Sequence, residues 1–346
     1  MNFTSDNVTP VCEPILAAVQ AANGDNAPSY GGDALTRRLE RRFSELFERE
    51  VAVFPVATGT AANALALSQL APGFGGIYCH ETAHIVTDEC GAPEFFTGGA
   101  KLIGLAAPDG RIQARQIADG IAFATEMGVH HVKPAAVSLT QATEWGTVYP
   151  LVRLAEITAT AHAAGLPVHM DGARFANALV HLGCSPAEAT WKQGIDVLSF
   201  GATKNGALCA EAVVFFDPAA AADFARRRKR AGHLWSKMRF ISAQLLAYLE
   251  QDLWLRNAAH ANAMALRLAK GIAALPGVRL LQPVEANEVF LAMPEDRVAK
   301  LEKQGFGFYR WPLCAVRDAT PIRLVTSWAT PESAVEGLLA AASSVG

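Results

Sequence analysis

Residues Val168–Arg174 have the sequence VHMDGAR, and this stretch indicates the fold class. Its first three residues form a short strand candidate that runs directly into Asp171. A second strand candidate, Asp196–Phe200, is followed by a short turn and Lys204. Polar residues that follow parallel strands gather at one edge of a sheet. We therefore expect Asp171 and Lys204 to lie close together.

Strand candidates alternate with helical patterns on both sides of this stretch. Apolar runs predict strands at Val51–Val56, Gly76–Cys79, Lys101–Gly104, Ala135–Leu139 and Glu211–Phe216. Alanine-rich segments predict helices from about Thr60 to Leu70 and from about Leu151 to Ala164. This alternation is typical of an α/β domain with a largely parallel sheet.

The pattern changes after about residue 224. Helical patterns over Phe240–Leu255 and Ala258–Leu275 precede strand candidates near Val278–Leu281, Glu288–Ala292 and Ile322–Thr326. A chain of 346 residues is also too long for one small core. We expect an N-terminal arm over residues 1–14 that contributes to the active site, a large α/β domain over 15–250 and a small α+β domain over 251–346.

The composition argues against several classes of protein. Hydrophobic residues make up 51% of the chain, which is too apolar for a disordered protein. The net charge of −3 gives no reason to expect a nucleic acid or an anionic membrane as partner, and the basic run Arg226–Arg230 is interpreted as a solvated helix face or a subunit contact. The chain has no apolar run long enough for a transmembrane helix and no secretory signal. Its six cysteines occur singly, so we expect a cytoplasmic protein with reduced thiols.

Polar features at three strand ends together predict a site for pyridoxal phosphate. The segment Ala57–Asn63 (ATGTAAN) joins a strand to a helix, and a Gly-Thr turn at a helix N-terminus suits a phosphate. Lys204 can form a Schiff base, and Asp171 can keep a pyridine nitrogen protonated. Taken singly, each could be an unrelated loop residue. Their order along the chain favours the cofactor.

With these motifs in place, the sequence resembles the low-specificity L-threonine aldolases, which are pyridoxal-phosphate enzymes of fold type I. The resemblance covers essentially the whole chain and depends on Ser5-Asp6-Asn7, Ser29-Tyr30-Gly31, Ala57–Asn63, His84, Asp171–Arg174, Thr203-Lys204 and Ile322–Thr326. It implies a large domain with a mainly parallel seven-stranded sheet and a small α+β domain. It further implies a lyase that reversibly cleaves L-threonine, L-allo-threonine and related β-hydroxy-α-amino acids, including phenylserine, to glycine and an aldehyde.

The resemblance also assigns roles around the cofactor ring. Lys204 would carry the Schiff base, and Asp171 would pair with the pyridine nitrogen. His84 would stack on the ring and take part in catalysis. Arg174 would lie near the phenolic oxygen of the cofactor and near the substrate.

A second group of residues would hold the phosphate. Gly59 and Thr60 are assigned to it by the resemblance. Thr58 and Asn63 are either further phosphate ligands or a helix cap and a helix surface residue. Arg239 is matched to a phosphate-binding arginine that the neighbouring subunit donates, because these enzymes assemble their sites at the interface of a dimer, and such dimers pair into homotetramers.

The remaining assignments concern the substrate. Ser5 and Arg323 would bind its carboxylate, and a guanidinium group matches a carboxylate in two-point geometry. Tyr30 would enter the pocket from the neighbouring subunit. His130, chosen over its neighbour His131, would lie close to the side-chain hydroxyl group and recognise or deprotonate it.

Two alternatives stay open at this point. Another fold type I enzyme, such as a β-eliminating lyase or a transaminase, would use the same scaffold. In addition, His80–His84 fits the zinc-protease pattern H-E-x-x-H, although its position after a short strand argues against a helix, and no metal is expected. The segment Thr140–Gly146 departs from the Asn-Thr-His-Asn type of the related enzymes, which affects substrate preference.

Overall fold

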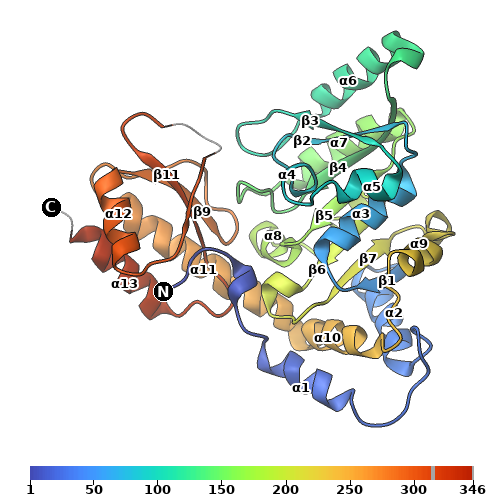
Figure 1. The fold of residues 1–346 in the computed structure, drawn as a ribbon, viewed down its shortest axis with the longest axis horizontal. Coiled ribbons are helices and arrows are strands. Elements are labelled where there is room, and N and C mark those ends of the chain that lie inside the picture. The colour runs from blue at the N-terminus through green and yellow to red at the C-terminus, as the bar shows by residue number, and fades with distance from the viewer. Residues whose placement is uncertain (313–315, 345–346) are drawn as a thin grey trace.

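The structure is a computed structural model that describes residues 1–312 and 316–344, and it contains two sheets with their own helices (Figure 1). The larger sheet has seven strands in the order β1-β7-β6-β5-β4-β2-β3. Their bounds are β1 Ala52–Val56, β2 Gly75–His80, β3 Lys101–Leu105, β4 Lys133–Thr140, β5 Val168–Gly172, β6 Val197–Gly201 and β7 Glu211–Phe215. The expected seven-stranded sheet is thus confirmed.

Strands β3, β2, β4, β5 and β6 run parallel to one another, whereas β7 is antiparallel to both of its neighbours. The carboxyl ends of the parallel strands therefore meet at one edge of the sheet. The predicted strands lie within two residues of the observed ones; the largest differences are that β4 begins at Lys133 and β5 continues to Gly172.

Helices cover both faces of this sheet, because successive side chains of a strand point to opposite faces and every residue of β5, β6 and β7 is buried. In β6, Val197 packs toward α3 (Gly59–Leu70) and α9 (Phe224–Arg230), while Leu198 and Phe200 pack toward the opposite helices. Those opposite helices are α2 Ala34–Leu46, α6 Ala114–Met127, α7 Leu151–Ala163, α8 Phe175–Leu182 and α10 Arg239–Leu249. The large domain is therefore a three-layer α/β unit.

The smaller sheet is antiparallel, in the order β10-β11-β9-β8, and lies beside the large domain (Figure 1). Its elements are α11 Leu253–Ala273, β8 Arg279–Leu280, β9 Glu288–Met293, α12 Glu295–Lys303, β10 Tyr309–Arg310, β11 Thr320–Val325 and α13 Glu332–Ser343. The first turns of α11 pack into the core of the large domain, and its later turns pack into the core of the small one. The exact domain boundaries stay a prediction.

The sequence-based helix boundary between α10 and α11 was wrong. The expected break near residue 256 lies instead at residues 250–252, where Gln251 and Asp252 have φ angles of 51° and 55°. Neither residue is glycine or proline, so the turn leaves no compositional mark. The short strand β10 was also not predicted, nor were the helices α1 (Glu13–Ala21), α2, α4 (His84–Thr87), α5 (Ala92–Thr97), α6, α8, α12 and α13.

The N-terminal residues join the two domains. The amide of Phe3 donates to Gly307 O at 2.7 Å, and Phe3 O accepts from the amide of Val325 at 2.8 Å, so the chain begins against the small sheet. It then passes to α1, which packs on α10 beneath the large domain (Figure 1). Between these two anchor points the segment crosses the carboxyl edge of the large sheet.

Candidate active site

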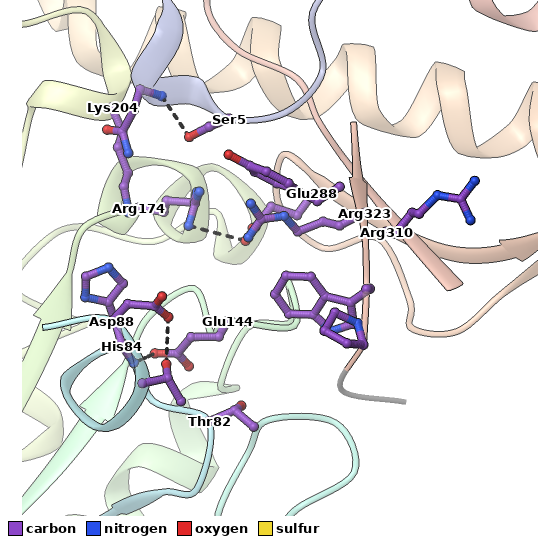
Figure 2. Close-up of a pocket in the computed structure, with 15 residues that line it drawn as sticks. Ser5, Thr82, His84, Asp88, Glu144, Arg174, Lys204, Glu288, Arg310 and Arg323 are labelled. Carbon is purple, nitrogen blue, oxygen red and sulfur yellow. Dashed lines mark hydrogen bonds and ion pairs between the residues drawn. The ribbon is translucent and has the colours of Figure 1, made fainter. Parts of the chain in front are cut away.

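Two adjoining cavities of about 530 and 550 Å³ form one cleft at the carboxyl edge of the large sheet. Six residues line both cavities: Asn7, His84, Asp88, Glu144, Arg174 and Lys204. The second cavity also reaches Asp171 and the start of α3, and the first extends to the small domain (Figure 2). The sequence-based expectation that Asp171 and Lys204 lie together is met, because both line the second cavity.

Lys204 is held by a short turn directly after β6. Gly201 ends that strand so close to β5 that an added Cβ atom would lie 2.7 Å from Ala173 Cα. The 3₁₀ turn Thr203–Asn205 follows, and the carboxylate of Glu211 on β7 accepts from the amides of Ala202 at 3.1 Å and Thr203 at 3.4 Å. Glu211 is buried, and burial raises its pKa to about 7.

Asp171 ends a chain of hydrogen bonds that begins at His84. Asn63 Nδ2 on α3 donates to Asp171 Oδ2 at 2.7 Å and to Glu89 Oε1 at 2.8 Å. Glu89 Oε1 also lies 2.9 Å from His84 Nδ1. The hydrogen bond with Glu89 raises the pKa of His84, and this effect outweighs the lowering by burial. Asn63 therefore links two buried carboxylates and is neither a phosphate ligand nor a surface residue.

The N-terminus of α3 forms the end of the second cavity. Thr58 is the helix cap, and its hydroxyl oxygen accepts from the amide of Ala61 at 3.2 Å. The first amides of a helix have no intrahelical acceptor, so those of Gly59 and Thr60 can serve a ligand. An added Cβ atom at Gly59 would meet nothing within 4 Å, so the space beside it is open.

The residues of this cavity fit pyridoxal phosphate. A helix N-terminus with open space suits the phosphate, the carboxylate of Asp171 suits the pyridinium nitrogen, and the Lys204 amine suits the aldehyde carbon. The three groups line one cavity of sufficient volume, and all were expected from the sequence.

A cluster of buried ion pairs forms the boundary between the two domains. Arg174 makes a two-point contact with Asp6, with Nε–Oδ2 at 2.8 Å and Nη2–Oδ1 at 3.0 Å. Its Nη1 lies 3.5 Å from Glu288 Oε2, and Glu288 Oε1 lies 3.7 Å from Arg323 Nη1. Burial alone would lower the pKa of Arg174, but the carboxylates of Asp6 and Glu288 outweigh burial and raise it.

Arg323 on β11 faces the first cavity from the small domain (Figure 2). Its guanidinium carbon lies 5.2 Å from the ring centre of Tyr309 and 4.9 Å from that of Trp311, and Nη2 donates to Thr4 O at 3.2 Å. Its Nε is buried and has no hydrogen-bond partner within the described part of the chain. Ser5, on the N-terminal segment, lines the same cavity. A rigid guanidinium with a free donor suits a carboxylate.

Glu144 forms part of the wall across the cleft from Arg323 (Figure 2). Its Oε1 accepts from the His84 amide and from Thr140 Oγ1, each at 2.8 Å. Its Oε2 is buried without a hydrogen-bond partner among residues 1–312 and 316–344. Burial raises the pKa of Glu144 to about 7.

The structure places His130 outside this cleft, so its sequence-based choice was wrong. His130 ends a 3₁₀ turn, Gly128–His130, that precedes β4, whereas the cleft follows the other end of that strand. A strand of eight residues spans about 26 Å at roughly 3.3 Å per residue. His130 is not among the residues that line either cavity.

Tyr30 and Arg239 also lie outside the cavities of this chain. Tyr30 is half exposed, its amide donates to Ser236 O at 3.0 Å, and Lys229 Nζ lies 4.3 Å from its ring centre. Arg239 Nε donates to Ala22 O at 3.0 Å. The two segments expected to reach a neighbouring subunit therefore lie side by side, and their donation across an interface stays a prediction.

The zinc-protease pattern does not have its required helical context. His80 is the last residue of β2, and His84 is the first residue of the four-residue helix α4. Both ring nitrogens of His80 are engaged, Nε2 with Ala107 O at 2.8 Å and Nδ1 with the Thr82 amide at 3.1 Å. Over the described ranges, no group of three or more His, Cys, Asp or Glu side chains is arranged to hold a metal ion.

Several residues in or beside the cleft were not identified from the sequence, namely Asp6, Glu89, Glu144, Glu211 and Glu288. They share a buried or partly buried carboxylate that contacts an identified residue or, for Glu211, the turn that carries Lys204. Glu144 had one usable indication, since it lies in the segment Thr140–Gly146 that departs from the expected type. The others become recognisable only when the chain is folded.

Comparisons with known proteins match this geometry. The family model described as Beta-eliminating lyase matches residues 2–296. A low-specificity L-threonine aldolase from a Pseudomonas species is 46% identical, covering 98% of this chain and 96% of that protein. The protein of the same name from Pseudomonas aeruginosa is 48% identical, covering 89% and 88% of the two chains.

Solved structures give the same result at the level of the fold. A threonine aldolase from Leishmania major superposes with a TM-score of 0.92 at 28% identity and covers 99% of this chain and 98% of that chain. A serine palmitoyltransferase from Sphingomonas wittichii superposes with a TM-score of 0.72 at 15% identity, covering 99% and 86%. The fold therefore extends over the whole described chain.

Proposed function

Because the chain belongs to the beta-eliminating lyase family and, within it, to the low-specificity L-threonine aldolases, we propose that it cleaves L-threonine and L-allo-threonine to glycine and acetaldehyde. Related β-hydroxy-α-amino acids such as phenylserine are included, and the reaction is reversible. The observation that carries the proposal is one cleft in which Lys204, Asp171 and Arg323 come together in such a chain.

Pyridoxal phosphate is the proposed cofactor. When bound, it supplies an electron sink for bonds that break at the substrate Cα atom. Lys204 would hold it covalently, Asp171 would keep its ring nitrogen protonated, and His84 would stack on the ring. The start of α3 would bind the phosphate through Gly59 and Thr60, with Thr58 as the cap that fixes the helix N-terminus.

The substrate would be oriented by the small domain. Arg323 would bind its carboxylate through the free Nε, with Ser5 nearby on the N-terminal segment. Arg174, which contacts Asp6, would lie near both the cofactor and the substrate. Fixing the carboxylate selects which bond at Cα is aligned for cleavage, because orientation is set before the chemical step.

The protein is further proposed to act as a cytoplasmic dimer or homotetramer. One exposed apolar side chain near the cleft supports self-association, since Leu208 is 53% exposed at the rim of the second cavity. Tyr30 and Arg239 would then serve the neighbouring subunit. None of the helices described in the structure has the length and hydropathy needed to cross a membrane.

An absorption spectrum with a product assay tests the proposal. We expect a visible band that shifts on addition of glycine, and equimolar glycine and acetaldehyde from L-threonine. Lys204→Ala should lose the normal band and the activity, whereas Lys101→Ala, exposed on β3, should keep both. A keto acid or ammonia as product would indicate another fold type I enzyme, and a colourless protein with stoichiometric zinc would indicate the zinc alternative.

A further inference from the structure

We propose that the carboxylate of Glu144 accepts the proton of the substrate β-hydroxyl group during cleavage and returns it in the reverse reaction. This inference rests on the aldolase function proposed above. It assigns the proton-transfer role to a residue on the loop after β4, in place of His130 at the opposite end of that strand.

The first argument is the arrangement of the Glu144 oxygens. Oε1 is fixed by two donors at 2.8 Å, the His84 amide and Thr140 Oγ1. Oε2 has no hydrogen-bond partner in the described chain, and it is buried. A buried acceptor without a partner costs free energy, so the carboxylate gains when a bound ligand offers a hydroxyl donor. The fixed Oε1 limits the positions that Oε2 can take.

The second argument is the position of Glu144 in the cleft. It lines both cavities, so it borders the region where cofactor and substrate meet. With the substrate carboxylate at Arg323 and the substrate amino group on the side of Lys204, the groups attached to the substrate Cβ atom face the remaining wall. Figure 2 shows that wall, which consists of Thr82, His84, Asp88 and Glu144.

Two other residues of this wall can also accept a proton, but each is less suited. Asp88 is exposed, and its Oδ2 already accepts from Thr87 Oγ1 at 2.7 Å. His84 Nδ1 is engaged by Glu89 at 2.9 Å, and its ring is needed for stacking. Glu144 is the carboxylate of this wall that combines a fixed orientation with an unpaired oxygen.

The surroundings of Glu144 also shift its pKa toward neutral pH. The ionisable groups that face it are Asp171 on β5, His84 on α4, Cys79 on β2, and Tyr149. Burial, with the charge of Asp171, raises its pKa to about 7, although the bonds from the His84 amide and Thr140 act in the opposite direction. A group with a pKa near the working pH is effective both as base and as acid.

The proposed step balances as follows. The β-hydroxyl O–H bond breaks, and its proton passes to Glu144. The electron pair left on oxygen forms the C=O bond of the aldehyde as the Cα–Cβ bond breaks. The electron pair of that broken bond stays with the glycine fragment until a proton replaces it. In the reverse direction protonated Glu144 returns the proton to the aldehyde oxygen.

The test compares two reactions of the holoenzyme. Cleavage of L-threonine requires loss of the hydroxyl proton, whereas exchange of the glycine Cα hydrogen with deuterium in the solvent does not involve this proton. For Glu144→Gln we expect kcat/KM for cleavage to fall by about 10²–10⁴-fold, with glycine exchange and the glycine-induced spectral shift close to those of the wild type. Glu144→Asp should recover part of the cleavage activity.

A matched variant identifies the titrating group. Thr140→Val preserves the shape of the side chain but removes one hydrogen bond to the ionised form of Glu144, which raises a carboxyl pKa. We expect the rise of kcat/KM with pH to move to higher pH in Thr140→Val, and to disappear in Glu144→Gln.

The possible outcomes separate the two proposals. Full cleavage by Glu144→Gln, or equal loss of cleavage and glycine exchange, would overturn the role of Glu144 and leave the aldolase function intact. An unmoved pH profile in Thr140→Val would also overturn it. A wild-type protein that exchanges glycine hydrogen but releases no aldehyde from any β-hydroxy amino acid would refute the aldolase function, and the role of Glu144 with it.

Discussion

Glu89 is a buried carboxylate whose Oε1 contacts His84 Nδ1 at 2.9 Å and Asn63 Nδ2 at 2.8 Å. Its hydrogen bond is the largest influence on the pKa of His84 and raises it, although burial acts in the opposite direction. Through Asn63 the same carboxylate is connected to Asp171. The protonation of His84 and the orientation of the Asp171 carboxylate are therefore linked within one chain of hydrogen bonds.

The first prediction concerns Glu89→Gln. A neutral amide cannot stabilise the imidazolium form, while burial continues to destabilise it, so the pKa of His84 should fall. A pH titration of histidine NMR signals in selectively labelled protein measures this change. Glu81→Gln, exposed in the turn before α4, is the control. An unchanged pKa of His84 in Glu89→Gln would show that the hydrogen bond is not formed in solution.

At the scale of the element, Glu211 connects β7 to the turn that carries Lys204. Its carboxylate accepts from the amides of Ala202 and Thr203, and burial raises its pKa from 4.5 to about 7. The folded protein therefore binds this proton more tightly than the unfolded chain. Stability contributed by Glu211 is lost as the pH rises from about 4.5 toward 7, because ionisation is unfavourable in the folded state.

The second prediction follows from this loss of stability as Glu211 ionises. Glu211→Gln keeps one carbonyl oxygen, which can accept from the closer amide of Ala202, but it cannot ionise. Relative to the wild type, its free energy of unfolding should increase with pH and reach a gain of up to about 3 kcal/mol above pH 7, since one pKa unit corresponds to about 1.4 kcal/mol. Urea unfolding of both apoproteins at several pH values measures the difference. Glu126→Gln, exposed on α6, is the control. A difference that is constant with pH would contradict the prediction.

The third prediction concerns the turn between α10 and α11. Gln251 has a φ of 51°, a conformation that costs non-glycine residues about 1–2 kcal/mol, and glycine avoids this cost. The gain is partly offset by the greater entropy of glycine in the unfolded chain. Gln251→Gly should therefore stabilise the protein by about 0.5–1 kcal/mol. Ala263→Gly, exposed within α11, should instead destabilise it by about 1 kcal/mol. Equal effects of both substitutions in urea unfolding would refute this explanation of the turn.

The elements also show what the sequence could and could not reveal. The central strands were predicted correctly because they are short apolar runs buried on both faces. Lys204 and Asp171 were found because they follow such runs. The break before α11 was misplaced because no glycine or proline marks it. His130 was chosen from its proximity to β4 in sequence, but the cleft lies at the far end of the strand.

At the scale of the whole molecule, three parts of the chain converge on one buried charge cluster. Asp6 comes from the N-terminal segment, Arg174 from the large domain, and Glu288 and Arg323 from the small domain. No local pattern marks these residues as partners, since they lie far apart in sequence. The predicted roles of Ser5, Arg174 and Arg323 thus depend on carboxylates that become apparent only in the folded chain.

Asp6 provides the last prediction because it holds the N-terminal segment against both domains. Burial is the largest single influence and would raise the pKa of Asp6, but Arg174, Lys204 and Asn287 together outweigh it and lower this pKa. A lowered pKa means that the stabilisation is present above the unfolded value of 3.8 and is lost as the pH falls through the folded value. Asp6→Asn leaves Arg174 without its two-point partner, and breaking such a buried pair costs about 3–5 kcal/mol.

We therefore expect Asp6→Asn to unfold at lower urea concentration at pH 7, with a deficit that shrinks under acidic conditions. It should also bind glycine more weakly in a spectral titration, because Asp6 would no longer hold the N-terminal segment, which carries Ser5 and contacts Arg323 through Thr4 O. Asp25→Asn, exposed in the loop before α2, should change neither property. If Asp6→Asn retained wild-type stability and glycine affinity, the N-terminal segment would be held by its backbone pairing with the small sheet alone, and the charge cluster would not couple the two domains.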